Sequence, residues 1–223
     1  MLLQIILFIF PWKIRKILLC KFCKFKMGSG SKIGFSIICA REVMIGNNSH
    51  IGHLTYCKDI DRLVIGDNSR IGNNVKITGF SINSPLVKLH GHFSHIFDRK
   101  CELVIGNHVG ITSNHYFDCN GGIYIGDYAQ IAGLDSIFMT HSIDLSNCRQ
   151  DAEPIRIGRY TFVGTRVTLL KGSEIANCCV VGAGAVVGKK FKTDYMLVGG
   201  VPAKEIKSVK GYNFFERKEG FVK

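Results

Sequence analysis

The chain has 223 residues, of which 46% are hydrophobic and 21% charged. This composition excludes a disordered protein and is typical of one globular domain with short appendages. The formal net charge of +12 favours an anionic partner, such as nucleic acid, a phosphorylated cofactor or an acidic membrane surface. Nucleic acid is the least favoured, because the basic residues gather in residues 13–26 and 189–223 without a basic and aromatic stripe between them.

Residues 1–27 are predicted to form a short apolar and basic helix. The first ten residues are almost wholly apolar, and Pro11 and several basic residues follow. A helix that spans a bilayer needs about 20 apolar residues, and a signal peptide carries its positive charge before the apolar run. Two interpretations fit: the helix caps the main domain, or it lies on a membrane surface with Ile14, Ile17 and Leu18 toward the lipid.

An aliphatic residue recurs at every sixth position over long stretches of residues 28–198. In the most regular block these positions are Ile157, Val163, Leu169, Ile175, Val181 and Val187. A period of six fits neither an α-helix nor a simple strand alternation, but it fits a unit of one short strand and one turn. Since one unit cannot bury its aliphatic side chain alone, stacked units must form the core. The segment is therefore predicted to be an all-β domain, a parallel β-helix of hexapeptide repeats.

The repeat is interrupted twice within this domain. Residues 79–101 and residues 144–155 leave the register and are predicted to be loops that project from the coil, while a smaller slip lies around residues 120–122. The repeat ends after Tyr195, and residues 199–223 are predicted to be a C-terminal tail. Long loops on a rigid scaffold are common places for functional residues.

Five motifs carry a resemblance to a known family. In chain order they are Met139-Thr140-His141-Ser142-Ile143-Asp144, Pro154-Ile155-Arg156-Ile157-Gly158, Phe162-Val163-Gly164-Thr165, Gly182-Ala183-Gly184-Ala185-Val186-Val187 and Gly200-Val201-Pro202-Ala203-Lys204. This ordered set resembles the hexapeptide-repeat O-acetyltransferases, which include galactoside and maltose acetyltransferases and enzymes that modify surface polysaccharides. The resemblance covers the chain from Ser31 to the C-terminus. It implies a left-handed coil, a homotrimer and acetyl-CoA as the acyl donor.

His141 is the candidate catalytic base. A hydroxyl group that attacks a thioester must lose its proton, and histidine, with an ordinary pKa of about 6.5, suits this role. His141 lies at a predicted corner just before the second loop, and the resembling enzymes carry their catalytic histidine in this motif. Asp144 is the candidate to orient the imidazole; alternatively it caps the following turn.

The resemblance also implies a site for the donor. A narrow pantetheine arm requires small residues along its groove, and cationic side chains suit the phosphates of CoA. An oxyanion site needs N–H groups that face the developing charge, and Thr165 occupies this place in the resembling enzymes. The candidate cofactor-binding residues are Phe162, Gly164, Thr165, Ala183, Gly188, Lys189, Lys204 and Lys207. The alternatives are corner geometry for the small residues and solvated surface charge for the lysines.

Asn114, His115 and Asp118 are candidate acceptor contacts, in a segment that resembles a polysaccharide-associated branch of the family. His115 is expected on a neighbouring edge of the coil, from which it would approach His141 of another protomer in a trimer. An edge hydrogen-bond network is the alternative. The predicted reaction is acetyl transfer from acetyl-CoA to a hydroxyl of a sugar or glycan, in the cytoplasm or at the inner face of the membrane.

Two other functional classes compete with this prediction. A zinc enzyme of the γ-carbonic anhydrase type needs three histidines around the metal. His141 has no histidine five residues away, and the pair His90 and His95 lies in an irregular loop, so no metal is expected. A non-catalytic trimeric scaffold is the other class. The nine cysteines are odd in number and scattered, which predicts free thiols in a reducing cytoplasm.

Overall fold

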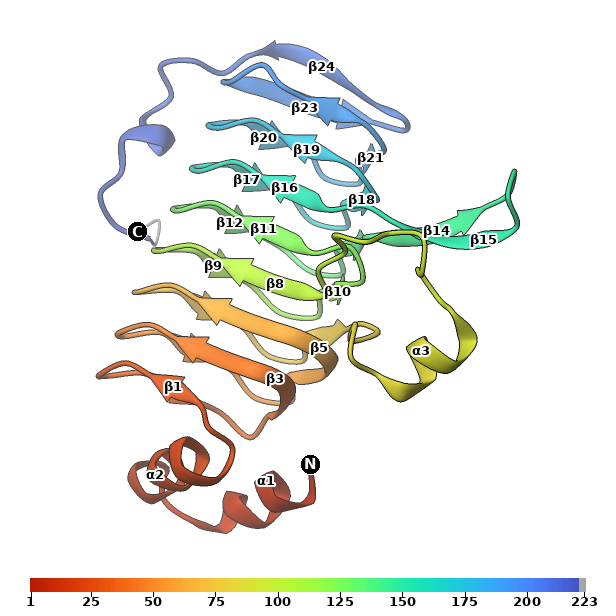
Figure 1. The fold of residues 1–223 in the computed structure, drawn as a ribbon. Helices are drawn as coiled ribbons and strands as arrows, with labels where there is room; N and C mark the ends of the chain where they lie inside the picture. Colours follow the sequence, from red (N-terminus) through yellow and green to blue (C-terminus); the bar gives the residue numbers. More distant parts are fainter. Residues whose placement is uncertain (221–223) are drawn as a thin grey trace.

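A computed structural model describes residues 1–220 and shows a stack of parallel strands wound into coils (Figure 1). A 13-stranded sheet and a 9-stranded sheet form its sides. The larger sheet turns a corner within β3 (Ile37–Ile45) and β5 (Tyr56–Ile65), where the register shifts between Cys39 and Ala40. The stack therefore has three faces, which the chain visits in a fixed order. This arrangement is consistent with a β-helix, and its left-handed winding stays a prediction.

Each face is a ladder of short strands that pair with the strands one coil away. The first face contains β1 (Lys26–Met27), the second halves of β3 and β5, β8 (Glu102–Ile105), β11 (Ile123–Ile125), β16 (Ile155–Ile157), β19 (Glu174–Ile175) and β22 (Lys190–Phe191). The second face contains β2 (Lys32–Ile33), β4 (His50–Ile51), β6 (Arg70–Ile71), β9 (Gly110–Ile111), β12 (Gln130–Ile131), β17 (Phe162–Val163), β20 (Val180–Val181), β23 (Met196–Gly200) and β24 (Ala203–Ser208). The third face contains the first halves of β3 and β5, β7 (Lys76–Thr78), β10 (Tyr116–Asp118), β13 (Ile137–Met139), β18 (Thr168–Leu170) and β21 (Val186–Val187).

Aliphatic side chains six residues apart form the interior of the stack. Ile157, Val163 and Leu169 are each at most 3% exposed, and they belong to one core cluster that runs through the coils. Each coil covers the apolar side chains of its neighbours, so the core grows with every unit added. Phe117 and Phe138 stack in this core with ring centroids 4.4 Å apart, and both are fully buried.

Replacing Phe138 with alanine is expected to lower the free energy of unfolding by about 3–5 kcal/mol, because it removes a buried ring and leaves a cavity beside Phe117. Urea unfolding followed by circular dichroism measures the loss. The matched control is Phe97→Ala, whose ring is 97% exposed and whose loss should stay within about 0.5 kcal/mol. Equal losses in the two variants would contradict the described packing.

Glycine follows many of the inward aliphatic residues because adjacent coils approach closely there. A Cβ atom on Gly66 would lie 2.6 Å from the side chain of Asn107 and from the backbone of Gly106. The Asn107 carboxamide oxygen instead accepts a hydrogen bond from the backbone N–H of Asp67 at 2.8 Å. The spacing of the coils therefore explains the glycine that the repeat carries at this corner.

The N-terminal segment closes one end of the stack (Figure 1). It consists of α1 (Leu2–Ile6), the 3-10 helix η1 (Leu7–Ile9) and α2 (Trp12–Phe22). Leu7 and Leu19 join the main core, and the carboxamide of Gln4 exchanges hydrogen bonds of 2.9 and 2.7 Å with the backbone N–H and C=O of Ile38. Among the described residues, no helix is long and apolar enough to cross a membrane.

The C-terminal segment returns along the outside of the stack (Figure 1). After β24 pairs antiparallel with β23, the 3-10 helix η2 (Asn213–Glu216) follows. The side chain of Gln130, three coils before β23, donates a hydrogen bond of 2.5 Å to the carbonyl of Gly220. The tail therefore packs on the coils between the first and second faces.

Two insertions leave the stack at one edge, between the third and first faces (Figure 1). Residues 79–101 contain the short helix α3 (Pro85–His90). The second insertion is an antiparallel hairpin of β14 (His141–Asp144) and β15 (Arg149–Ala152). The sequence predicts an irregular loop that starts at Asp144, whereas the ordered hairpin starts at His141, because its two arms satisfy each other's backbone hydrogen bonds.

Candidate active site

His141 lies at the edge where both insertions leave the stack. It follows β13 directly and opens the hairpin, while residues 79–101 project from the same edge at lower coils. Its side chain is 26% exposed. The residue is thus held by the rigid coil on one side and open to solvent on the other.

Asp118 is the carboxylate that contacts this imidazole. It ends β10, which pairs with β13 so that Asp118 lies opposite Met139. Its side chain is 1% exposed, and Oδ2 accepts a hydrogen bond from Nδ1 of His141. A proton held on Nδ1 leaves Nε2 with its lone pair, which is the state that a general base requires.

Asn120 contacts both Asp118 and His141. Its backbone N–H and its side-chain Nδ2 donate hydrogen bonds of 3.1 and 2.6 Å to Oδ1 of Asp118, and Nδ2 lies 3.2 Å from Nδ1 of His141. Its carboxamide oxygen accepts from the backbone N–H of Phe80 at 2.7 Å, and its carbonyl accepts from Arg99 at 3.0 Å. Asn120 therefore ties the first insertion to the catalytic candidates.

Thr140 fixes the backbone between the two coils. Its hydroxyl donates a hydrogen bond of 2.6 Å to the carbonyl of Asp118 and accepts one of 2.8 Å from the backbone N–H of Gly121. The side chain is fully buried. This double contact sets the height of His141 above Asp118.

Aromatic rings of the first insertion surround the exposed side of His141. Phe80 and Phe93 meet the imidazole edge-on, with ring centroids 6.4 and 6.2 Å away. Arg99 lies over the ring of Phe93 at 4.5 Å. A cavity of about 480 Å³ lies between the insertion and the hairpin, and it is lined by His90, Gly91, His92, Phe93, Ser94, His95, Ile143, Cys148, Arg149 and Gln150. His141 does not line this cavity, but Phe93, which does, contacts its imidazole.

Asp144 does not orient His141. Its Oδ1 accepts hydrogen bonds from the backbone of Ser146 and Asn147, at 3.1 and 3.3 Å, and its Oδ2 accepts from the Asn147 side chain at 2.7 Å. The hydrogen bond from the Asn147 side chain is the main cause of the lowered pKa of this carboxyl. Asp144 thus caps the hairpin turn, and the carboxylate beside the imidazole comes from the coil below.

Asn114 and His115, two of the predicted acceptor contacts, lie away from His141 of the same chain, on the neighbouring edge where His115 is expected. Asn114 lies at the other edge of the third face, where its oxygen accepts a hydrogen bond of 3.0 Å from Asn74. His115 is 1% exposed. Its Nδ1 accepts from the backbone N–H of Ser136 at 3.1 Å, and its Nε2 lies 2.9 Å from the hydroxyl of Thr112. Both residues belong to an edge hydrogen-bond network, and Asp118, the third predicted contact, is buried against the imidazole.

The stability of the protein should depend on pH through His115. Burial lowers the pKa of its imidazole to about 4, from 6.5. Because the native state binds this proton more weakly than the unfolded chain, the stabilisation is complete above about pH 6.5 and is lost as the pH falls toward 4, by about 3 kcal/mol in total. Urea unfolding between pH 4.5 and 7 measures this loss of unfolding free energy. In His115→Asn the unfolding free energy should depend less on pH. An unchanged slope in that variant would assign the effect to other groups.

The small residues expected to line the donor groove gather at a different edge, between the second and third faces. Gly164 and Thr165 follow β17, and Ala183 follows β20 one coil above. A Cβ atom on Gly164 would lie 2.9 Å from the backbone nitrogen of Ala183. The backbone N–H of Gly184 donates to the Thr165 carbonyl at 2.9 Å. The coil geometry requires the glycine there, and Thr165 and Ala183 are exposed.

The other donor candidates are dispersed. Phe162 lies on the second face against Phe214 of the tail, with ring centroids 5.7 Å apart. Gly188 and Lys189 are exposed on the same edge as His141, further along the stack, and Lys204 and Lys207 are exposed on β24. One chain therefore does not bring these residues together with His141.

Several site residues could not be found from the sequence. Asn120 lies where the repeat slips, and that break is the signal that marks it. Thr140 is part of the motif around His141, but its role as a spacer depends on contacts to another coil. Phe93 and Arg99 lie in the insertion without a motif. Within residues 1–220, no three His, Cys, Asp or Glu side chains are grouped closely enough to hold a metal ion.

Part of the chain is similar in sequence to a known protein. No protein-family model matches the chain. A segment of 97 residues is 31% identical to the probable acetyltransferase Rv3034c of Mycobacterium tuberculosis, and the match covers 43% of this chain and 32% of that protein. The chain thus spans about a third of the length of that relative.

Two solved structures are similar over most of the chain. The polysialic acid O-acetyltransferase OatWY has a TM-score of 0.53 at 20% identity, covering 82% of this chain and 88% of its own. A mutant of AntD, an N-acyltransferase from Bacillus cereus solved with dTDP-4-amino-4,6-dideoxyglucose and coenzyme A, has a TM-score of 0.53 at 16% identity, covering 92% and 90%. At these sequence identities, the two structures show only that the chain has a similar fold. The chain thus resembles sugar acyltransferases in its three-dimensional structure, as its motifs predict.

Proposed function

We propose that the protein is an acetyl-CoA-dependent O-acetyltransferase that acts on a hydroxyl of a sugar or glycan. The observation that carries this proposal is the buried Asp118 beneath the half-open His141, because the pair leaves Nε2 as a base at an accessible edge. Nε2 takes the proton of the acceptor hydroxyl as its oxygen bonds to the thioester carbonyl carbon. The C–S bond then breaks, and the imidazolium returns the proton to the departing CoA sulfur.

The cavity that Phe93 links to His141 is the proposed acceptor site. His90, His92 and His95 line it from the first insertion, and Arg149 lines it from the hairpin. Aromatic rings suit the apolar faces of a sugar, and the guanidinium of Arg149 favours an acceptor that carries a negative charge. Asp151 lies next to these lining residues, with its carboxylate 4.0 Å from His95. It accepts a hydrogen bond from Lys171, and its negative charge reduces the positive charge of the site.

The donor site requires a second copy of the chain. Thr165 and Ala183 lie at one edge of the third face and His141 at the other, so a single chain separates the candidate donor groove from the base. If edges of two copies meet, both groups line one cleft. We therefore propose a homotrimer, in which Lys189, Lys204 and Lys207 supply cations for the CoA phosphates. We place the protein in the cytoplasm, at the inner face of the membrane.

A thiol-release assay with acetyl-CoA tests the proposal. The purified protein is expected to release CoA in the presence of an acidic glycan, more slowly with the neutral glycan of matched length, and to run as a trimer in light scattering. An amino sugar as acceptor separates O-transfer from N-transfer, since acetylation of the amine resists mild base whereas the ester does not. Absence of CoA binding together with a monomeric state would overturn the proposal.

A further inference from the structure

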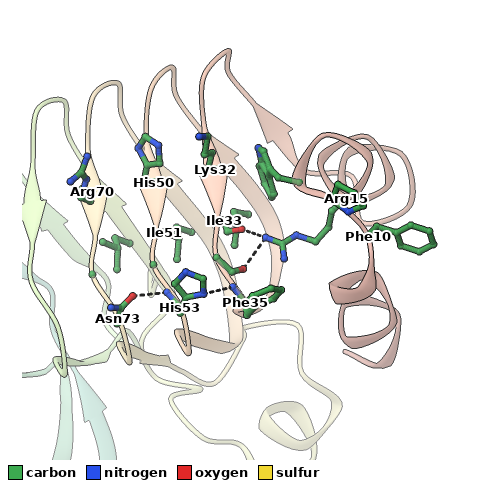
Figure 2. A pocket seen from close by; sticks show the side chains of 16 residues that line it. Phe10, Arg15, Lys32, Ile33, Phe35, His50, Ile51, His53, Arg70 and Asn73 are labelled. Atoms are coloured by element: carbon green, nitrogen blue, oxygen red, sulfur yellow. Dashed lines mark hydrogen bonds between the residues drawn. The ribbon is translucent and has the colours of Figure 1, made fainter.

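A second cavity lies far from His141, at the N-terminal end of the stack. Its volume is about 580 Å³, and it opens between α2 and the first three strands of the second face, β2, β4 and β6 (Figure 2). Phe10 and Trp12 line it from the N-terminal segment, and Phe35 and His53 line it from the turns of the coils. The proposed acyl transfer uses none of these residues.

Basic side chains line this cavity in a row. Lys32, His50 and Arg70 occupy equivalent positions on consecutive coils, because Lys32 pairs with His50 and His50 with Arg70. Paired strands lie about 4.8 Å apart, so the three side chains form a ladder on the outer surface of the face (Figure 2). Burial, and then the charges of Arg70 and Lys32, lower the pKa of His50. Such a row is suited to an anion that bridges its members.

Arg15 adds a buried guanidinium to the same cavity. It is 5% exposed, and Nη2 donates to the carbonyls of Ile33 and Gly34. Its guanidinium lies over the rings of Trp12 and Phe35, at 4.9 and 5.5 Å. Among the described residues, its buried Nε has no hydrogen-bond partner. A buried donor without an acceptor is unfavourable, which points to an acceptor supplied from outside the chain.

The helices next to the cavity expose an apolar surface. Leu2 is 72%, Ile9 78% and Ile17 66% exposed, although their neighbours Leu7 and Leu19 are buried in the core. Phe10, which lines the cavity, connects this surface to the cationic ladder. Within residues 1–220, the residues that line the cavity include Arg15, Lys32 and Arg70 but no carboxylate. Apolar and cationic groups therefore meet at one end of the molecule.

We propose that this end of the stack binds the phosphate of an anionic lipid in a membrane surface. The phosphate lies against the ladder, where Lys32 donates hydrogen bonds to its oxygens, while Ile9 and Ile17 enter the acyl-chain region. This inference does not depend on acyl transfer. It places His141 about four coils, roughly 20 Å, from the coil of β3 that adjoins the membrane end, since β3, β5, β7, β10 and β13 pair in succession.

Vesicle co-sedimentation with the full chain tests the proposal. The protein is expected to bind phosphatidylcholine vesicles that contain phosphatidic acid and to stay in solution with phosphatidylcholine alone. Lys32→Glu should weaken binding roughly tenfold or more, because it reverses a charge at the lipid phosphate. Lys210→Glu, the same charge change in the exposed tail, should stay within about twofold. Ile17→Asp should weaken binding, whereas Ile206→Asp on the exposed side of β24 should not.

Three results would overturn the proposal of lipid binding. Equal binding to both kinds of vesicle would remove the role of the phosphate. Equal weakening by Lys32→Glu and Lys210→Glu would mean that net charge alone attracts the protein. Displacement of the protein from vesicles by millimolar inorganic phosphate, with Ile17→Asp binding as tightly as the native chain, would make the cavity a site for free phosphate. Circular dichroism of each variant confirms that the coils are intact, and thiol release with a soluble acceptor reports separately on the proposed enzyme.

Discussion

Replacing His141 with asparagine is expected to lower kcat for acetyl transfer by about 10²- to 10⁴-fold, the range that a general base contributes. The imidazole is the group that Asp118 prepares for proton abstraction, and the carboxamide that replaces it cannot accept a proton at neutral pH. The KM for acetyl-CoA should change little, because Thr165 and Ala183, the candidates for the pantetheine groove, lie at another edge of the coil. Steady-state thiol release with an acidic glycan measures both constants.

The matched control is His108→Asn. His108 is at the edge between the first and second faces, where it stacks on Tyr128 with ring centroids 4.6 Å apart. It adopts a positive φ of 57°, which asparagine tolerates well. This variant should keep kcat within about twofold. Activity of His141→Asn near that of the native chain would remove His141 from the mechanism, and with it the proposed reaction.

The period of six predicted the stack because its physical cause is local. An aliphatic side chain at every sixth position, as at Val163 and Leu169, has to point the same way in each unit, and stacking is the arrangement that buries all of them. The glycines at the corners follow from the same spacing of coils. Handedness is different, since the interval between buried residues is identical in either winding, and that prediction rested on the resemblance.

The candidate site could be predicted only in part, because its contacts cross coils. The motif around His141 pointed to the candidate base, but it also suggested Asp144, which is close in sequence. The actual partner, Asp118, is one coil away, and its distance from His141 is set by β-pairing between β10 and β13. Asp144 instead bonds within its own hairpin turn. In a coiled stack, a residue's nearest neighbours in space are those one coil away. Closeness in sequence is therefore a poor guide to which side chains are in contact.

The same reasoning explains why His115, on the neighbouring edge, is buried. Its sequence context, with Asp118 close behind, resembles that of a site residue. The side chain nevertheless faces the interior of a corner, where the backbone of Ser136 and the hydroxyl of Thr112 occupy both ring nitrogens. A period of six fixes the corner on which a residue lies, but the bend of the backbone decides whether its side chain points inward. Asn120 shows the converse, since a slip in the repeat places it beneath the imidazole.

Replacing Asp118 with asparagine is expected to lower kcat by about 10²-fold or more, although the side chain keeps its size. The oxygen of the new carboxamide should occupy the place of Oδ1, where Asn120 donates two hydrogen bonds. Its NH₂ group then faces Nδ1 of His141 and can only donate to it. The imidazole must therefore carry its proton on Nε2, the tautomer that cannot act as the base.

Asp144→Asn is the matched control, and it should keep kcat within about twofold, because this carboxylate serves the hairpin turn. Two further readouts separate tautomer control from a merely structural role of Asp118. The KM for acetyl-CoA should be unchanged in Asp118→Asn, and Asp118→Glu should recover part of kcat, since its carboxylate can again accept from Nδ1. If Asp144→Asn lost as much activity as Asp118→Asn, the catalytic carboxylate would belong to the hairpin, and the buried pair would be a structural contact alone.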